Sequence, residues 1–227
     1  CYGIAALGAG GKVTISDSTA NGNGGTGIAA SGLTGSQELG LDSVATPDQV
    51  IIERCTASNN DGRGIQVLNI SGDVTISDCT TNGNSDDGVA VGGLLSSDEL
   101  GGVLLVDGGD LTIKNCTSNS NGASGFDPEV IGGTVSIQAC IARDNDQHGV
   151  DLDWWRMTET VLVNGSIICG NECGISLISL QETQESEHFA NGPTTDMNFE
   201  GNWWGCPDGP EAAGCDPICQ LDGISVD

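Results

Sequence analysis

The stretch VTISDCTTNGNSDDGV, residues 74–89, begins with alternating apolar and polar side chains and ends in a run rich in asparagine, acids and glycine. Such alternation is typical of a β-strand with one buried face, and the polar run is typical of a turn. The same pattern recurs along the chain, which indicates a repeat. The other copies are VTISDSTANGNGGTGI (13–28), VIIERCTASNNDGRGI (50–65), LTIKNCTSNSNGASGF (111–126), VSIQACIARDNDQHGV (135–150) and VLVNGSIICGNECGI (161–175).

The spacing of the copies indicates a solenoid. The glycines that end them are Gly27, Gly64, Gly88, Gly125, Gly149 and Gly174, at steps of 37, 24, 37, 24 and 25 residues. A period near 24 with short strands is typical of coils that bury their inner faces only against their neighbours. We therefore expect an all-β protein of about seven coils of ~24 residues, with longer loops in alternate coils and equivalent residues stacked ~4.8 Å apart.

These stacked short strands resemble the right-handed parallel β-helix of pectate-lyase-like proteins and of many bacterial surface proteins. The segment GNWWGCPDGP (201–210) resembles one that follows the last coil in such surface proteins, which implies that Trp203 and Trp204 cover the end of the core. We accordingly expect β-helix coils over 1–196, and the last coil with a C-terminal cap over 197–227.

Charge and composition restrict the partners and the location of the chain. Its 32 acidic and 6 basic side chains give a net charge of −26, which disfavours nucleic acid and anionic membranes, because both require basic patches. No apolar run approaches the ~20 residues of a membrane span. The opening CYGIAAL matches the end of a copy, so we expect the chain to begin in mid-coil as part of a larger secreted polypeptide.

Two polar columns recur at fixed register, and we interpret both as structural. Stacked cysteines lack the C-x-x-C clustering of zinc sites, and their parallel Cβ vectors would strain a bridge, so we expect buried free thiols. The asparagines predict a ladder of hydrogen-bonded amides at a turn, and we expect the repeat glycine to adopt a turn conformation that other residues avoid. The columns are Cys55, Cys79, Cys116 and Cys140, and Asn23, Asn60, Asn84, Asn121 and Asn145.

The remaining cysteines indicate disulfide bonds. Cys206 and Cys215 lie in a loop-rich segment near the C-terminus, where we expect them to pair. Cys169, Cys173 and Cys219 are near enough in the chain for a second bridge, and its pairing, like that of Cys1, stays open. Disulfides favour an oxidising, extracytoplasmic compartment.

One group of acids departs from the repeat. If Val150 points inward, Asp151 and Asp153 point outward, and the same register in the preceding coil places Asp127 and Glu129 beside them, ~5 Å away. Residues bordering this patch are His148, Trp154, Trp155 and Arg156. Like charges this close raise one another's pKa or require a cation.

Three interpretations of the patch stay open. The four carboxylates fit a Ca²⁺ site, which needs six to eight oxygen ligands. Alternatively, Asp151, Asp153, Asp127 and His148 are candidate catalytic groups for polysaccharide cleavage, with Trp154, Trp155 and Arg156 as contacts to the sugar. The third interpretation is a solvated acidic face without a ligand.

Pectate-lyase-like proteins include polysaccharide lyases and pectin-type glycosidases, so the resemblance raises the possibility of an enzyme. Asp86 and Asp87 resemble the paired acids of the glycosidases, and QHG (147–149) resembles their histidine motif, but no R-x-K is present. Because fold alone does not give function, we expect a non-catalytic extracellular or surface module, such as a stalk, adhesin or matrix component. It would require no cofactor, with Ca²⁺ as an optional ligand and a polysaccharide or cell-surface glycan as partner. The alternative is a polysaccharide lyase or glycoside hydrolase.

Overall fold

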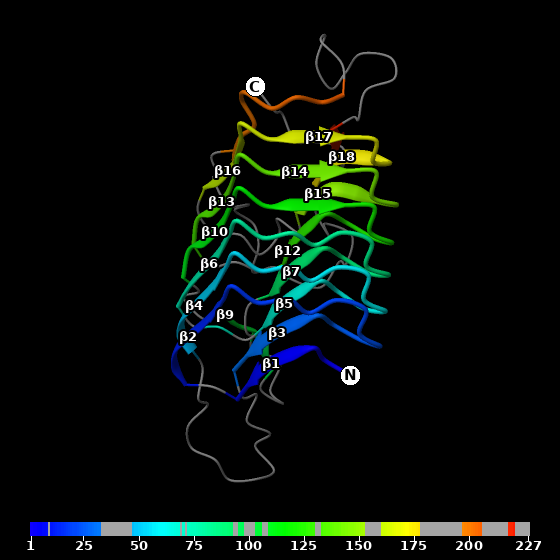
Figure 1. Ribbon diagram of the computed structural model, residues 1–227. Helices are drawn as coiled ribbons and strands as arrows, with labels where there is room; N and C mark the ends of the chain where they lie inside the picture. The colour runs from blue at the N-terminus through cyan, green and yellow to red at the C-terminus, as the bar shows by residue number, and fades with distance from the viewer. Residues whose placement is uncertain are drawn as a thin grey trace.

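The strands of the chain wind into coils that stack along one axis, in order from the first coil to the last (Figure 1). The computed structural model describes residues 1–8, 10–32, 47–68, 70, 72–92, 95–97, 103–105, 109–129, 133–152, 160–177, 197–205 and 218–220. These residues contain strands, turns and bends but no helix, so the predicted all-β class is confirmed. No candidate membrane-spanning helix is found among them.

Three parallel sheets form the walls of the solenoid, and each coil contributes one segment to each wall. Sheet A consists of β1 (Ile4–Leu7), β3 (Ile28–Ser31), β5 (Ile65–Leu68), β7 (Val89–Gly92), β12 (Phe126–Glu129), β15 (His148–Leu152), β18 (Cys173–Leu177) and β20 (Ile218–Gln220). Sheet B consists of β2 (Gly11–Ser16), β4 (Pro47–Glu53), β6 (Asp73–Ser77), β10 (Leu111–Lys114), β13 (Val135–Gln138), β16 (Val161–Asn164) and β19 (Met197–Asn198).

Sheet C is the shortest wall. Its strands are β11 (Thr117–Asn119), β14 (Ile141–Arg143) and β17 (Ile167–Cys169). Single bridges continue this column to Thr19, Thr56 and Thr80 on one side and to Trp203 on the other. A separate antiparallel pair, β8 (Leu95–Ser97) and β9 (Val103–Leu105), lies within one of the 37-residue steps.

The strand register follows the repeat. Ile65 pairs with Val89, and Phe126 pairs with both Val89 and Val150, so equivalent positions of successive copies stack. Val74 and Ile76 are buried while Thr75 and Ser77 between and after them are more exposed, which is the alternation expected of a strand with one face in the core. The core is therefore a continuous apolar column along the solenoid axis.

Left-handed residues turn the chain sharply at both ends of each sheet C segment. Asp78 (φ 54°) follows β6, and Gly83 (φ 65°) precedes the asparagine of the same coil. The same two positions have positive φ in the other coils: Asp17, Arg54, Asn115, Ala139 and Gly165 at the first turn, and Gly22, Asn59, Ser120, Asp144 and Gly170 at the second. Asn, Asp and Gly, which tolerate this conformation best, account for most of these positions.

The repeat glycines have a different role from the one predicted. They are not among the residues with positive φ, so the expectation of a turn conformation at the end of each copy is wrong. A Cβ at Gly88 would collide with Ser118 Oγ and would lie 2.8 Å from the carbonyl oxygen of Gly125 in the next coil. Glycine is required here because successive coils approach closely, and not because of its backbone freedom.

The asparagine column forms a buried ladder of amides. Asn84 Oδ1 accepts hydrogen bonds from the backbone N (3.1 Å) and Nδ2 (2.9 Å) of Asn60. Asn84 Nδ2 donates to Asn121 Oδ1 (3.1 Å) and to the carbonyl of Ala57 (3.1 Å). The same bonds join Asn121 to Asn145 and Asn145 to Asn171, so the ladder ties the turns of successive coils together.

The cysteine column contains free thiols. Cys55, Cys79, Cys116 and Cys140 are each at most 2 % exposed, and none of them forms a disulfide bond. The Sγ of Cys79 donates to the carbonyl of Ser77 (3.1 Å) and to that of Ile52 in the preceding coil (3.7 Å). Hydrogen bonding to Cys140 raises the pKa of Cys116 to about 12, which keeps this buried thiol protonated.

The C-terminal cysteines and tryptophans differ from one another in their environments. Cys173 is disulfide-bonded, whereas Cys169 is buried and free. Cys206 and Cys215 lie outside the described residues, as does the side chain of Cys219. Trp204 is only 6 % exposed and belongs to the core, and Trp203 is 46 % exposed. That the two side chains cover the end of the core stays a prediction.

Candidate functional site

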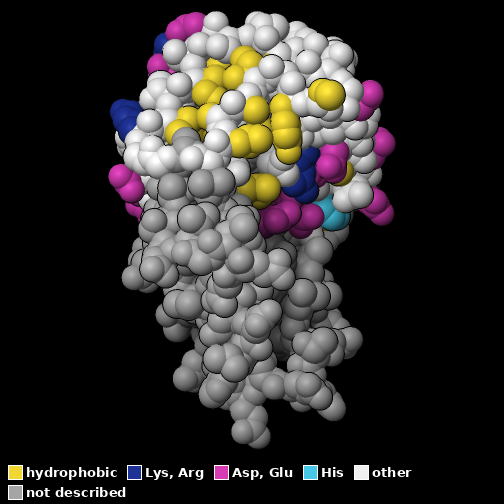
Figure 2. Space-filling view, turned by 90° about the horizontal axis from the view of Figure 1, so that it is seen from below, with side chains coloured by type: hydrophobic (Ala, Val, Ile, Leu, Met, Phe, Trp, Pro, Cys, Tyr) yellow, Lys and Arg dark blue, Asp and Glu magenta, His cyan; other side chains and the backbone are white. Residues whose placement is uncertain are grey.

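A group of charged side chains from four successive coils lies on the outer side of sheet A and in the turns that lead into it. We call it the sheet A cluster, and it consists of Arg63, Asp86, Asp87, Asp127, Glu129, His148 and Asp151. Viewed along the solenoid from its N-terminal end, basic, acidic and histidine side chains gather beside an apolar area (Figure 2).

The strand register brings the acids of two coils together. Phe126 and Val150 are Cα partners and both are buried, so the residues that follow them, Asp127 and Asp151, point outward from neighbouring strands. Glu129 lies two positions further along β12, on the same face as Asp127. Of the residues singled out from the sequence, Asp153, Trp154, Trp155 and Arg156 lie outside the described residues.

Arg63 is the residue that the sequence analysis missed. Its Nε lies 3.1 Å from Asp87 Oδ2 and 3.4 Å from Asp86 Oδ2, and its Nη2 lies 3.8 Å from Glu129 Oε1. A signal was present, because Arg63 and Asp87 both directly precede a repeat glycine and therefore stack in adjacent coils. The arginine thus joins acids that lie 24 and 66 residues further along the chain.

Small residues on β7 leave room for this contact. The strand that separates Arg63 from Glu129 carries Ala90 and Gly92 in the columns that hold Asp127 and Glu129 on β12. A Cβ at Gly92 would lie 3.4 Å from Glu129 Oε2. The glutamate can therefore lie across β7 toward the arginine of the coil beyond.

Asp127 is the most perturbed acid of the cluster. Burial and the negative charges of Asp87, Glu129 and Asp151 raise its pKa to about 9, and the positive charge of Arg63 only partly opposes them. Asp127 therefore retains its proton at neutral pH, unlike an ordinary aspartate. It can donate a hydrogen bond or a proton from the middle of an otherwise anionic group.

Asp87 and Arg63 form the most buried ion pair of the cluster. Asp87 is 5 % exposed, and its Oδ1 accepts a hydrogen bond from the backbone N of Ser124 at 3.1 Å. Burial opposes the charge of Arg63, but the carboxylates of Asp87 and Asp86 outweigh it and raise the arginine pKa. Asp87 therefore contacts both the guanidinium of Arg63 and the backbone of Ser124, which orients its carboxyl group.

His148 borders the cluster on β15. Its Nε2 lies 3.8 Å from Asp151 Oδ2, and its Nδ1 is buried without a hydrogen-bond partner in the described structure. No group of three or more His, Cys, Asp or Glu side chains among the described residues is arranged to hold a metal ion. The Ca²⁺ prediction includes Asp153, which lies outside the described residues.

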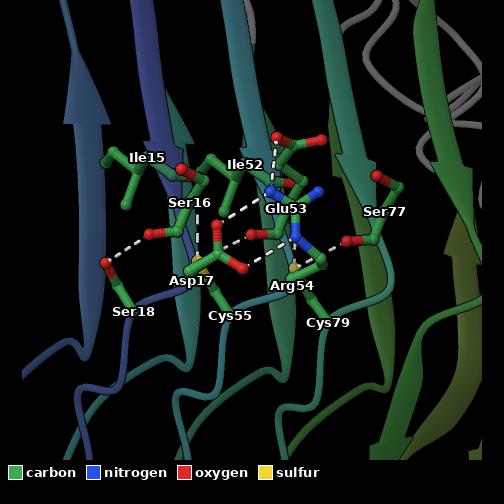
Figure 3. A network of polar contacts seen from close by, with 10 residues as sticks. All are labelled: Ile15, Ser16, Asp17, Ser18, Ile52, Glu53, Arg54, Cys55, Ser77 and Cys79. Carbon is green, nitrogen blue, oxygen red and sulfur yellow. Dashed lines mark hydrogen bonds and ion pairs between the residues drawn. The ribbon is translucent and has the colours of Figure 1, made fainter.

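A second arginine, Arg54, forms ion pairs outside the sheet A cluster, where the side chains are more exposed. Arg54, in the turn after β4, donates from Nε to Asp17 Oδ1 (2.7 Å) and from Nη2 to Asp17 Oδ2 (2.8 Å) and Glu53 Oε1 (2.9 Å), as Figure 3 shows. Asp17 and Arg54 have side chains 64 % and 50 % exposed. This network lies on the surface beside the cysteine column and links two coils.

Comparison with known proteins agrees with this architecture. The model of the family described as "Right handed beta helix region" matches residues 2–185. The chain belongs to this family. No curated protein and no solved structure matches this chain. Because one fold serves many functions, the function of this β-helix has to be argued from its own cluster.

Proposed function

We propose that this β-helix is a non-catalytic extracellular module, a stalk, adhesin or matrix component, that contacts glycans through the sheet A cluster. The observation that carries the proposal is the position of Arg63, which reaches acids from two other coils across the outer face of sheet A. Planar guanidinium and carboxylate groups fixed side by side offer paired donors and acceptors, which suit the hydroxyl groups of a sugar. The disulfide bond of Cys173 supports an extracellular location.

Charge indicates the kind of glycan. The cluster holds five acids against one arginine, on a chain with a net charge of −26. A polyanionic polysaccharide would be repelled by both the cluster and the chain. We therefore propose that the sugar unit in contact with the cluster is uncharged or carries an amino group.

Affinity electrophoresis through gels that contain neutral, cationic or anionic polysaccharides tests this proposal. We expect a neutral or amino-sugar polymer to retard the wild-type chain and the Arg54→Gln variant equally. The affinity of the Arg63→Gln variant for this polymer should be at least about tenfold lower, a loss of ~1.4 kcal/mol in binding free energy. Arg54 is the matched control because it forms comparable ion pairs away from the cluster. Equal retardation of both variants, or binding only to polyanions, would refute the proposal.

Ca²⁺ is an optional ligand of the same site. A cation that uses Asp127 must displace its proton, so Ca²⁺ binding should strengthen as the pH rises toward the pKa of about 9. The test is the melting temperature with Ca²⁺ and with EDTA at pH 6 and at pH 9. A melting temperature that does not depend on Ca²⁺ at either pH would contradict Ca²⁺ binding at this site.

Glycoside cleavage is the second candidate, and the raised pKa of Asp127 favours it. A carboxylic acid that keeps its proton beside other carboxylates can act as a general acid. Asp151, on the adjacent strand ~4.8 Å away, would then serve as nucleophile or base. Reducing-end and unsaturated-product assays on the retained polysaccharide decide the point, and activity that is lost in Asp127→Asn would establish an enzyme.

A further inference from the structure

The outer face of sheet C differs from the rest of the surface because it carries no acid among its described residues. We define the sheet C face by the outward columns on either side of the buried residues Ala57, Ser118 and Ala142. Its exposed or partly exposed residues are Thr19, Asn21, Thr56, Thr80, Asn82, Thr117, Asn119, Ile141, Arg143, Ile167 and Trp203, whereas Ser58 and Cys169, in the column of Asn82, are buried. The chain has 32 acids, and none of them lies in these described columns.

The polar part of the face is a fixed row of groups with free hydrogen-bonding capacity. Asn82 Oδ1 accepts from the backbone N of Asn119 (2.9 Å), and Asn119 Oδ1 accepts from that of Arg143 (3.0 Å). These bonds hold the amides in place and leave their Nδ2 hydrogens available. The hydroxyl groups of Thr80 and Thr117, in the neighbouring column, make no hydrogen bond within the described structure. The threonine hydroxyl groups therefore repeat once per coil over four coils, ~4.8 Å apart, from Thr19 to Thr117.

An apolar platform continues the threonine column toward the C-terminal end. Ile141 and Ile167 follow Thr117 in register, and Trp203 pairs with Ile167. Ile167 is 37 % exposed and Trp203 is 46 % exposed. An exposed tryptophan in line with hydroxyl and amide groups offers both a flat apolar surface and hydrogen bonds.

The dimensions of the face select its occupant. A segment of three residues is ~10 Å wide, and seven coils at ~4.8 Å span ~30 Å, which gives ~300 Å². A stable interface between proteins needs ~800 Å² from each partner, so a second copy of the chain would be held too weakly. A long, narrow strip with one arginine and no acid, on a chain with a net charge of −26, instead matches a single linear polymer that is itself uncharged.

We propose that the sheet C face binds one chain of an uncharged linear polysaccharide along the solenoid axis, with Trp203 stacked on a sugar ring. This site is distinct from the sheet A cluster and does not depend on it. The threonine column presents the same hydroxyl group to successive sugar units over four coils, and Ile141, Ile167 and Trp203 continue the face as an apolar surface. Binding should accordingly strengthen with the length of the polysaccharide until the face is filled.

Sedimentation with microcrystalline cellulose and with insoluble chitin tests the proposal. The double variant Thr80→Glu/Thr117→Glu places charge in the row, and Thr75→Glu/Thr112→Glu places the same charge on outward positions of sheet B in the same two coils. We expect the first variant and Trp203→Ala to bind at least about tenfold more weakly than wild type, ~1.4 kcal/mol, and the second to bind as wild type does. Circular dichroism and melting temperature establish that each variant is folded.

Three results would overturn the proposal. The first is the absence of wild-type binding to both polymers, and the second is an equal loss of binding in the two double variants. The third is a concentration-dependent dimer of the wild-type chain that Thr80→Glu/Thr117→Glu abolishes, because a second copy would then occupy the face. If the charged variant does not fold, Thr80→Val/Thr117→Val removes the hydroxyl groups while keeping their shape, with Thr75→Val/Thr112→Val as its control. Trp203→Ala should weaken binding by the same factor in the wild-type and the Arg63→Gln backgrounds, which assigns this loss to the sheet C face and not to the sheet A cluster.

Discussion

Substituting Asn84 by alanine should destabilise the whole solenoid. The Asn84 side chain is 2 % exposed, and its amide makes four hydrogen bonds with Asn60, Ala57 and Asn121. Truncation leaves both the backbone N–H and the Nδ2 of Asn60, and the carbonyl of Ala57, without the partners that they have in the ladder. Each buried polar group left unsatisfied costs ~1–3 kcal/mol, and entry of water offsets part of this, so we expect a loss of ~3–5 kcal/mol in the free energy of unfolding.

Urea unfolding followed by circular dichroism measures this loss, with Gln147→Ala as the control. Gln147 is an exposed amide, and surface substitutions change stability by ~0.5 kcal/mol or less. Asn84→Asp adds a second test, because it keeps the acceptors but loses the donors and buries a charge. This variant should be more stable at pH 4 than at pH 7, because a protonated acid can donate and carries no charge. The reasoning fails if Asn84→Ala costs less than ~1 kcal/mol, or if the stability of Asn84→Asp relative to wild type is independent of pH.

Other features lead to further predictions. Folding raises the pKa of Asp127 to about 9, so the folded chain binds this proton more tightly than the unfolded chain. The associated stability is complete below the ordinary pKa of ~4 and is lost as the pH rises from there to about 9. Asp127→Asn should therefore raise the urea midpoint at pH 9 more than at pH 4, and an equal effect at both would contradict this. Gly88→Ala should prevent folding or cost more than ~3 kcal/mol, seen as loss of the cooperative transition, because its Cβ would collide with Ser118; a fully stable variant would contradict the close approach of the coils. Thiol titration of the unreduced, unfolded chain should detect the described free thiols, and fewer than six would contradict their assignment: Cys1, Cys55, Cys79, Cys116, Cys140 and Cys169.

The sequence predicted the fold because the repeat carries its own register. Once Gly64 and Gly88 are aligned, Ile65 must stack on Val89, and the cysteine and asparagine columns follow from the same alignment. The roles of the glycines and the corner residues were not predictable in this way. A close approach between coils and a positive φ both select glycine, and only three-dimensional geometry shows that Gly88 serves the first and Gly83 the second.

The candidate site was predictable only in part. Alternation within strands indicates that Asp127 and Asp151 are neighbours on one face, since both follow a buried residue in adjacent coils. The contribution of Arg63 depends on the reach of a long side chain across β7, which requires the small residues Ala90 and Gly92 in between. Aligning the repeats shows which residues stack at the same position of successive coils. It does not show a contact such as that between Arg63 and Glu129, which joins different positions of coils that are not adjacent.

The central claim is that the sheet A cluster acts as one electrostatic unit that contacts a ligand. The most direct test is a ¹³C NMR titration of the Asp127 carboxyl carbon, free and with the polysaccharide that retards the chain in affinity electrophoresis. We predict a midpoint near pH 9 in the free chain, a lower midpoint in Glu129→Gln, and a shift of the wild-type midpoint when the glycan binds. A midpoint near 4 that neither Glu129→Gln nor the glycan changes would contradict the account.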